Sequence, residues 1–378
     1  MNESKATRYQ RLRRRAEAAG VAAGVLMLAL VALTPASKWL ADWSMSVGHG
    51  LTGAAREAVA LTAFVCLAVV LWEVVALPAV LYLGLTVDRR FRTAERTVEG
   101  VLGAQAHATL VGLPAALLAA AVVVLTVRVA GAWWWLLAGA VLAVALVAAM
   151  RAGPGLLLLV AETRPVGRQA LAARLAALAQ RAGVAIDRVD EWRVDDGTRA
   201  TALVTGVGRT RRVFVASPVL RDLGDDEVEV IVAHELAHHA HHDLWRAAAL
   251  DAVVLALGLG ASHLAVIACA PALGLGGPGD LRALPLIAVV AGSVWMIATP
   301  IRLAQSRAHE ARADRFALSL TGGAEAFQSA IRRLSAHHLV EDRPSTLTRW
   351  LYYRHPTVTE RLAAAEEFRA TAQASRRR

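Results

Sequence analysis

The chain has 378 residues, of which 56% are hydrophobic, a share typical of proteins that cross a membrane several times and not of ordinary soluble domains. Its formal charge of +10 is explained by arginines that anchor loops at an anionic membrane surface. We see no soluble module with clustered basic and aromatic residues, so we expect no nucleic-acid partner. Both cysteines, Cys66 and Cys269, lie in apolar runs, which argues against a disulfide framework or a cysteine-rich metal site.

Six stretches are apolar enough to cross a bilayer, whose core needs about 20 helical residues. They are residues 18–34, 61–86, 107–127, 133–160, 247–270 and 284–301. The first is short, and a cleaved signal peptide ending near Ala36 is the alternative, but the following segment returns to the membrane, which favours a retained anchor. Tryptophans at 133–135 are expected at a membrane surface.

Arginines are concentrated before the first span and after the second. They are Arg11, Arg13, Arg14, Arg15, Arg89, Arg90, Arg92 and Arg96. The positive-inside rule then places both termini in the cytoplasm, together with residues 161–246 and 302–378. We therefore expect a membrane region with four spans at 1–160, a soluble unit at 161–246, two further spans at 247–301, and a C-terminal helix region with a basic tail at 302–378.

The soluble unit has its own pattern. Residues 168–182 have the apolar spacing of a helix that ends at Gly183. Residues 199–205 and 212–216 have the composition of short strands and flank a turn at 206–210, which predicts a β-hairpin. An extended substrate can pair with the edge of such a hairpin; a purely structural hairpin is the alternative.

The motif His234-Glu235-Leu236-Ala237-His238 follows directly on the apolar run 228–233, which predicts a helix. Histidines four residues apart lie on one helical face and can bind one Zn²⁺. The glutamate between them is placed to deprotonate a zinc-bound water. Because so short a pattern also arises by chance, it needs support from the rest of the chain.

Catalytic zinc sites have three protein ligands and one open position for water. After the sixth span, residues 306–317 predict an amphipathic helix on which Glu310 and Asp314 share a face. One can bind zinc while the other accepts the free N–H of a ligand histidine; two solvated acids among arginines are the alternative. His309 neighbours Glu310 but points about 100° away on the helix, which disfavours it as a ligand.

These motifs together resemble the CAAX prenyl endopeptidase family of integral membrane zinc proteases and its heat-shock-type bacterial relatives. The resemblance covers about residues 133–361 and rests on His234, His238, Glu310, Asp314, His355, Pro356 and Arg361. One departure is Thr201-Ala202, where the family usually has Asn-Ala, and this puts a side-chain contact to substrate at that position in doubt.

The resemblance implies the roles of the motif residues. His234, His238 and Glu310 would bind one Zn²⁺ per chain. Glu235 would be the general base and then the proton donor to the leaving amine.

Three further residues are implied to support this set. Asp314 would hold a ligand histidine, and His355 and Arg361 would position groups or stabilise the oxyanion.

The expected fold is mainly α, a polytopic membrane helix bundle whose cytoplasmic-face zincin-like unit contains a small β-hairpin. The implied function is that of a membrane-embedded zinc endopeptidase acting on membrane-associated proteins or peptides, with the lipid bilayer as the other partner. The alternatives are a non-catalytic transporter or scaffold with a structural zinc site, and a repressor-cleaving sensor-transducer metalloprotease. The Ala/Leu/Arg-rich composition indicates a high-GC bacterial genome, where prenylated substrates are not expected.

Overall fold

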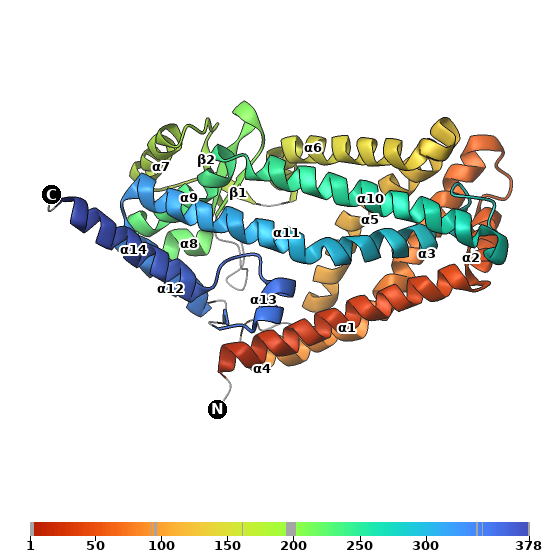
Figure 1. Cartoon of the computed structure of the whole chain (residues 1–378), viewed down its shortest axis with the longest axis horizontal. Coiled ribbons are helices and arrows are strands. Elements are labelled where there is room, and N and C mark those ends of the chain that lie inside the picture. The colour runs from red at the N-terminus through yellow and green to blue at the C-terminus, as the bar shows by residue number, and fades with distance from the viewer. Residues whose placement is uncertain are drawn as a thin grey trace. The chain divides into compact units, whose positions relative to one another are not determined.

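The computed structural model describes residues 4–91, 93, 97–160, 162–193, 202–337, 339–341 and 343–376. Helices dominate these residues, as predicted (Figure 1). They are α1 (Lys5–Leu33), α2 (Ala36–Val47), α3 (Gly53–Leu81), α4 (Asp88–Phe91), α5 (Val98–Ala130), α6 (Trp134–Val160), α7 (Gln169–Arg181), α8 (Ser217–Asp222), α9 (Asp225–Ala240), α10 (Asp243–Leu273), α11 (Leu284–Thr321), α12 (Ala324–His337), α13 (Thr346–Tyr352) and α14 (Val358–Arg376).

The chain forms two compact units, each built from separate stretches of sequence. We call them the site unit, made of Met1–Gln10, Ala145–Leu250 and Thr299–Arg378, and the membrane unit, made of Arg11–Val144 and Asp251–Ala298.

Within the described residues, five helical stretches are long and apolar enough to cross a membrane: Lys5–Leu33, Gly53–Phe91, Val98–Gly153, Asp243–Leu273 and Leu281–Thr321. The third stretch contains α5 and most of α6, separated by the 3-10 turn Gly131–Trp133, so each of the predicted spans falls on a helix. The predicted sixth span and the amphipathic helix after it form one continuous helix, α11. The residues that connect them are good helix formers, so nothing ends the helix there.

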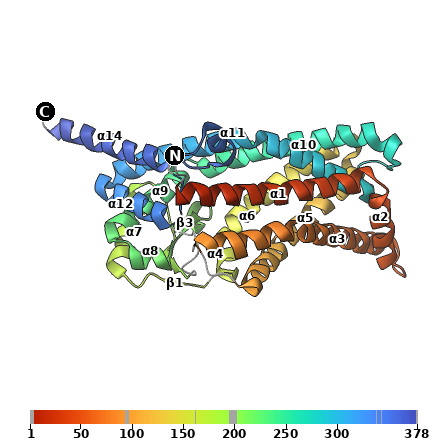
Figure 2. The same ribbon diagram turned by 90° about the horizontal axis from the view of Figure 1, so that it is seen from below.

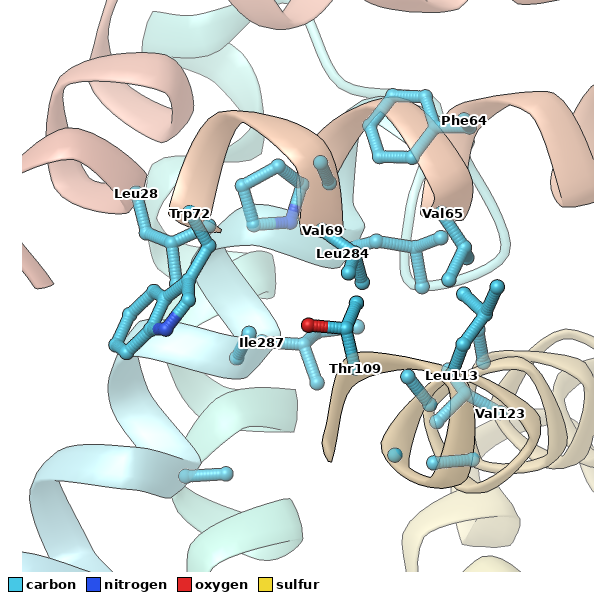
Figure 3. A pocket seen from close by; sticks show the side chains of 18 of the residues that line it. Leu28, Phe64, Val65, Val69, Trp72, Thr109, Leu113, Val123, Leu284 and Ile287 are labelled. Atoms are coloured by element: carbon cyan, nitrogen blue, oxygen red, sulfur yellow. The ribbon is translucent and has the colours of Figure 1, made fainter. Parts of the chain in front are cut away.

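In the membrane unit, the tryptophans at 133–135 differ from one another. Trp133 is exposed, as expected at a membrane surface, but Trp134 is fully buried. The Trp134 indole N–H donates to His263 Nδ1 at 3.0 Å, so this ring belongs to the interior of the unit. A largely apolar cavity of about 520 Å³ lies between the helices of this unit, with Phe64 and Trp72 in its wall (Figure 3).

The site unit contains a four-stranded sheet with the order β1-β2-β4-β3. Its strands are β1 (Thr163–Pro165), β2 (Val189–Trp192), β3 (Ala202–Thr205) and β4 (Arg212–Ala216). Strands β3 and β4 pair antiparallel, which is the predicted hairpin. Strand β2 adds parallel to β4, and β1 adds antiparallel to β2, beyond the prediction. Runs of three and four residues are too short for their alternation to be recognised in a sequence.

Helix α9 is packed against α7, α12 and strand β3 of the site unit (Figures 1 and 2). Leu171, Leu175 and Leu178 form one completely buried face of α7 in the same core. Gly183, with a φ of 68°, follows the end of α7 as predicted. Because protein interiors are close-packed, this core holds α9 in one orientation.

Candidate metal centre

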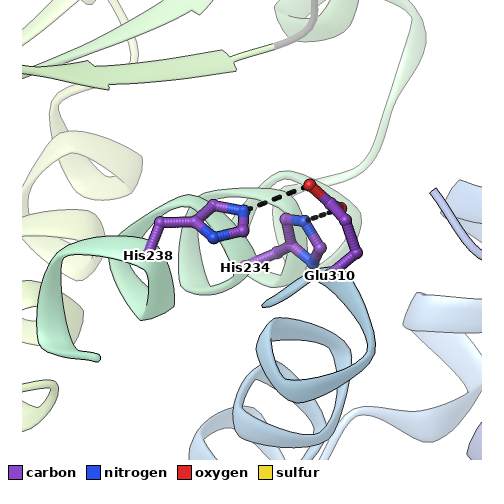
Figure 4. A group of neighbouring side chains, drawn as sticks. All are labelled: His234, His238 and Glu310. Atoms are coloured by element: carbon purple, nitrogen blue, oxygen red, sulfur yellow. Dashed lines mark hydrogen bonds and ion pairs between the residues drawn. The ribbon is translucent and has the colours of Figure 1, made fainter. Parts of the chain in front are cut away.

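The start of helix α9 is firmly held. Glu227 accepts hydrogen bonds from the Gly224 N–H at 2.8 Å and from Ser329 Oγ of α12 at 2.6 Å. Acidic residues in the first turn also suit the positive end of the helix dipole. From this start, the helical repeat places His234 and His238 on one face, with their ring centroids 5.1 Å apart (Figure 4).

Glu310 of α11 reaches both histidines. Its Oε2 lies 3.0 Å from His234 Nε2, and its Oε1 lies 3.5 Å from His238 Nε2 (Figure 4). One donor atom from each of the three residues lies within 4.8 Å of the other two. The structure therefore brings together the three residues that the resemblance implies as ligands.

The second ring nitrogen of His234 faces another carboxylate. Asp314, one turn beyond Glu310 on α11, places its Oδ1 2.9 Å from His234 Nδ1. Arg361 of α14 donates two hydrogen bonds to Asp314, at 2.6 and 2.8 Å. Arg361 is thus engaged with Asp314, which favours a positioning role for it over contact with an oxyanion.

His238 has a matching partner that the sequence does not reveal. Asp243, the first residue of α10 and only 3% exposed, accepts a hydrogen bond from His238 Nδ1 at 3.1 Å. Arg312 of α11 pairs with the other oxygen of Asp243. Because Asp243 follows His238 by five residues, the two would not lie on the same face of a continuous helix. A tight turn at His242, with a φ of 58°, returns Asp243 to the motif.

We expect Asp243→Asn to weaken zinc binding by about 10–100-fold, the usual cost of losing the partner that orients a ligand histidine. The amide is a weaker acceptor for the His238 N–H, and Arg312 loses its ion pair. Competition with a chromophoric chelator measures the affinity. Asp225→Asn, which removes an acid from the start of α9 instead, is the matched control and should bind zinc like the wild type. Equal affinities for both variants would contradict this role.

The donor set fits a zinc ion. Because the Nδ1 atoms of His234 and His238 face carboxylates, their Nε2 atoms are left to point toward Glu310. Ligand atoms of a tetrahedral zinc lie about 3.4 Å apart, given metal–ligand distances of about 2.1 Å. The observed separations of 3.0 and 3.5 Å lie on either side of that value. Within the described part of the chain this group has three members, which leaves a fourth position open.

Glu235 lies between His234 and His238 in sequence and is half-buried. Burial raises the pKa of its carboxyl group and outweighs the opposing effect of the nearby His234 and His238 charges. A carboxylate with a raised pKa is a better proton acceptor near neutral pH, as a general base requires.

The metal-free centre holds a proton on His234. Burial lowers the pKa of this histidine, but its hydrogen bonds to Asp314 and Glu310 outweigh burial and raise the pKa to about 9. Zinc must displace this proton at neutral pH. We therefore expect the apparent zinc affinity to rise about tenfold per pH unit as the pH increases toward 9. Chelator competition at about pH 6.5, 7.5 and 8.5 tests this, and an affinity that does not change with pH would refute it.

His355 approaches the centre from the segment between α13 and α14. Its Nδ1 lies 2.7 Å from Glu310 Oε2, and its side chain is 60% exposed, whereas the Glu310 side chain is 11% exposed. His355 is therefore on the solvent-accessible side of the cluster.

Strand β3 is fastened to helix α9, which carries His234 and His238. The buried ring of His239 donates from Nε2 to the Val204 carbonyl at 2.9 Å and accepts at Nδ1 from Arg211 Nε at 3.1 Å.

Thr201, the position where the family usually has asparagine, lies outside the described residues. His309 lies 3.8 Å from an Asp243 oxygen and is not a member of the ligand group.

Comparison with known protein families assigns the chain to one of them. The model of peptidase family M48 matches residues 165–369, more than half of the chain and all of the cluster described above. The chain belongs to peptidase family M48. A second model, described as CAAX prenyl protease N-terminal, five membrane helices, matches residues 2–157 of this M48 member. The resemblance inferred from the motifs is confirmed.

Relatives agree with this assignment. The metalloprotease YhfN of Bacillus subtilis is 27% identical over 208 residues, which cover 54% of this chain but only 49% of YhfN. Protease HtpX of Xanthomonas oryzae pv. oryzae is 31% identical over 217 residues, which cover 51% of this chain and 70% of HtpX. These M48 relatives are a metalloprotease and a protease. They therefore do not favour the two alternatives, which were a non-catalytic transporter or scaffold and a repressor-cleaving sensor-transducer.

The crystal structure of S. mikatae Ste24p has the same fold. It superposes with a TM-score of 0.70 at 18% identity and covers 82% of this chain and 76% of Ste24p. The predicted fold class, a mainly helical membrane bundle, is confirmed, and the chain is a multi-pass member of a family of membrane metalloproteases.

Proposed function

We propose that this M48 member is a zinc-dependent endopeptidase that hydrolyses peptide bonds of membrane-associated proteins or peptides. It binds one Zn²⁺ through His234, His238 and Glu310. The observation that carries the proposal is the convergence of these three donors, with Nδ1 of each histidine directed by a carboxylate. A structural zinc site would normally close its fourth position with a protein ligand, and this group has three members within the described residues.

The residues around the cluster have separate catalytic roles in this proposal. When bound, zinc supplies a Lewis acid that makes a water molecule acidic and polarises the scissile carbonyl. Glu235 takes the proton from the water and passes it to the leaving amine. His355, exposed beside Glu310, donates a hydrogen bond to the carbonyl oxygen as that oxygen gains charge. Asp314, supported by Arg361, keeps the His234 ring in its orientation.

The substrate is proposed to lie along β3. This strand is at the edge of the sheet, and the hydrogen bond between His239 and Val204 holds it beside α9. Pairing with an edge strand uses main-chain hydrogen bonds and therefore depends little on the substrate sequence. That mode suits the cleavage of varied membrane proteins or small membrane-associated peptides better than recognition of a prenylated C-terminus.

The proposed location is the cell membrane, with the metal centre facing the cytoplasm. The arginine-rich segments before the first span and after the second support this orientation by the positive-inside rule. The soluble part at 161–246 and the C-terminal region at 302–378 then lie on the same side as both termini.

The test is metal content measured together with proteolysis on the purified full chain. We expect one zinc per chain, cleavage of a membrane-protein or casein-type substrate, loss of cleavage after chelation and recovery when zinc is returned. Zinc that is bound while every substrate remains intact would support a structural site instead. A chain without zinc would overturn the ligand assignment.

A further inference from the structure

Helix α13 turns an apolar face outward from the site unit. Leu347, Trp350 and Leu351, spaced as neighbours on one helical face, are 70%, 52% and 39% exposed. The residue after α13 is also held, because the hydroxyl of Tyr353 donates to the buried Glu341 at 2.9 Å. An exposed apolar cluster of this kind usually marks a surface that contacts a protein or a membrane.

Arg307 holds α13 near the end of a membrane span. Its guanidinium donates to the backbone carbonyls of Arg349 at 3.2 Å and of Tyr353 at 2.8 Å. Along α11, Arg307 lies about 9 Å beyond Ile301, where the predicted sixth span ends. Lipid headgroups occupy about 5–8 Å on each side of the hydrocarbon core. Helix α13 is therefore fastened close to the outer edge of the headgroup layer.

Arginines accompany the apolar face. A hollow of about 490 Å³ beside Trp350 is lined by Arg307, Arg343 and Arg349. Arg349 is paired with Glu360 at 2.8 Å, but Arg343 and Arg354 are exposed and have no acidic partner among the described residues. Tryptophan and leucine flanked by arginine are typical of helices that lie in the plane of an anionic membrane surface.

We propose that α13 docks on the bilayer surface, with its three apolar side chains in the interface and with Arg343 and Arg354 facing anionic lipid phosphates. The chain continues from α13 to His355, whose Nδ1 lies 2.7 Å from Glu310. Docking therefore holds the accessible side of the metal centre next to the membrane surface. Only this last consequence rests on the proposed function, because lipid contact by α13 requires no catalysis.

The test uses full-length protein in nanodiscs that contain anionic lipid. In a background of Cys66→Ala and Cys269→Ala, an environment-sensitive fluorophore is attached at Leu347→Cys or Leu351→Cys. The control is Gln180→Cys, which is also an exposed position, on α7. We expect lipids with a spin-labelled headgroup or upper acyl chain to quench both α13 labels several-fold more than the control. Gel filtration confirms that each variant is folded and monodisperse.

The arginines are tested with the Leu351→Cys label. Arg343→Gln together with Arg354→Gln should reduce quenching in anionic nanodiscs and leave it unchanged in zwitterionic ones.

Equal, weak quenching at Leu347, Leu351 and Gln180 would overturn the proposal. In detergent, a substrate peptide could shield the α13 labels from solvent. If it does so, and lipid does not quench these labels, the proposal is overturned and the apolar face is assigned to substrate. Neither readout requires proteolysis, so failure here is distinct from failure of the proposed activity.

Discussion

Glu235→Gln is expected to abolish peptide hydrolysis while zinc remains bound. The amide keeps the size of the side chain but cannot accept the proton of the attacking water, and loss of a general base typically lowers the rate about 10²–10⁴-fold. The burial that raises the pKa of Glu235 makes this carboxylate an effective base near neutral pH. The comparison is turnover of a membrane-associated substrate, measured with the zinc content of the same preparation.

Glu366→Gln is the matched control for this variant, because it makes the same change at an exposed position on α14. It should retain full activity and full zinc content. Proteolysis by the Glu235→Gln variant at the wild-type rate would exclude Glu235 as the base. Loss of zinc along with activity would instead show that the substitution disturbs α9 itself, and the mechanism would then need another test.

The second large effect is expected at Glu310. Glu310→Gln replaces an anionic ligand by a neutral amide, so zinc affinity should fall by more than the about 10–100-fold that removing an orienting partner costs. Its carboxylate lies 3.0 Å from His234 Nε2 and 3.5 Å from His238 Nε2. Chelator competition gives the affinity, and thermal unfolding of the metal-free protein shows whether the fold survives.

The matched control for Glu310→Gln is Glu367→Gln, an exposed position on α14, which should bind zinc like the wild type.

The order of the effects on zinc affinity is also informative. Glu310→Gln should weaken zinc binding more than Asp243→Asn, because the first removes a ligand and the second only the partner of one. The reverse order would mean that Glu310 is not a ligand and that the cluster holds its metal in another way.

Some of the centre follows from patterns within a single segment. The separation of His234 and His238 by four residues predicts a shared helical face, and the same spacing relates Glu310 to Asp314. Which carboxylate meets which ring nitrogen is not a local property. It depends on how α11 packs against α9, and there the structure places Glu310 at Nε2 and Asp314 at Nδ1 of His234.

Asp243 shows why part of the site is hidden in the sequence. It follows His238 by five residues, a separation that neither a helix nor a strand brings onto one face. Only the turn at His242 and the pairing with Arg312 of α11 place its carboxylate at His238 Nδ1. Arg361 is similar, because its partner Asp314 is known only once α14 is placed against α11.

By itself, the sequence determined the membrane character, the predicted spans, the hairpin, the helix that carries His234 and His238, and the family resemblance. The resemblance depends on motifs in several segments, whereas the other features depend on composition or periodicity within one segment, where backbone geometry sets the outcome. Only the tertiary structure decided the two His–Asp–Arg chains at Asp314 and Asp243, the added strands β1 and β2, and the outward face of α13. These depend on contacts between segments far apart in the chain, and the packing of whole helices sets their distances.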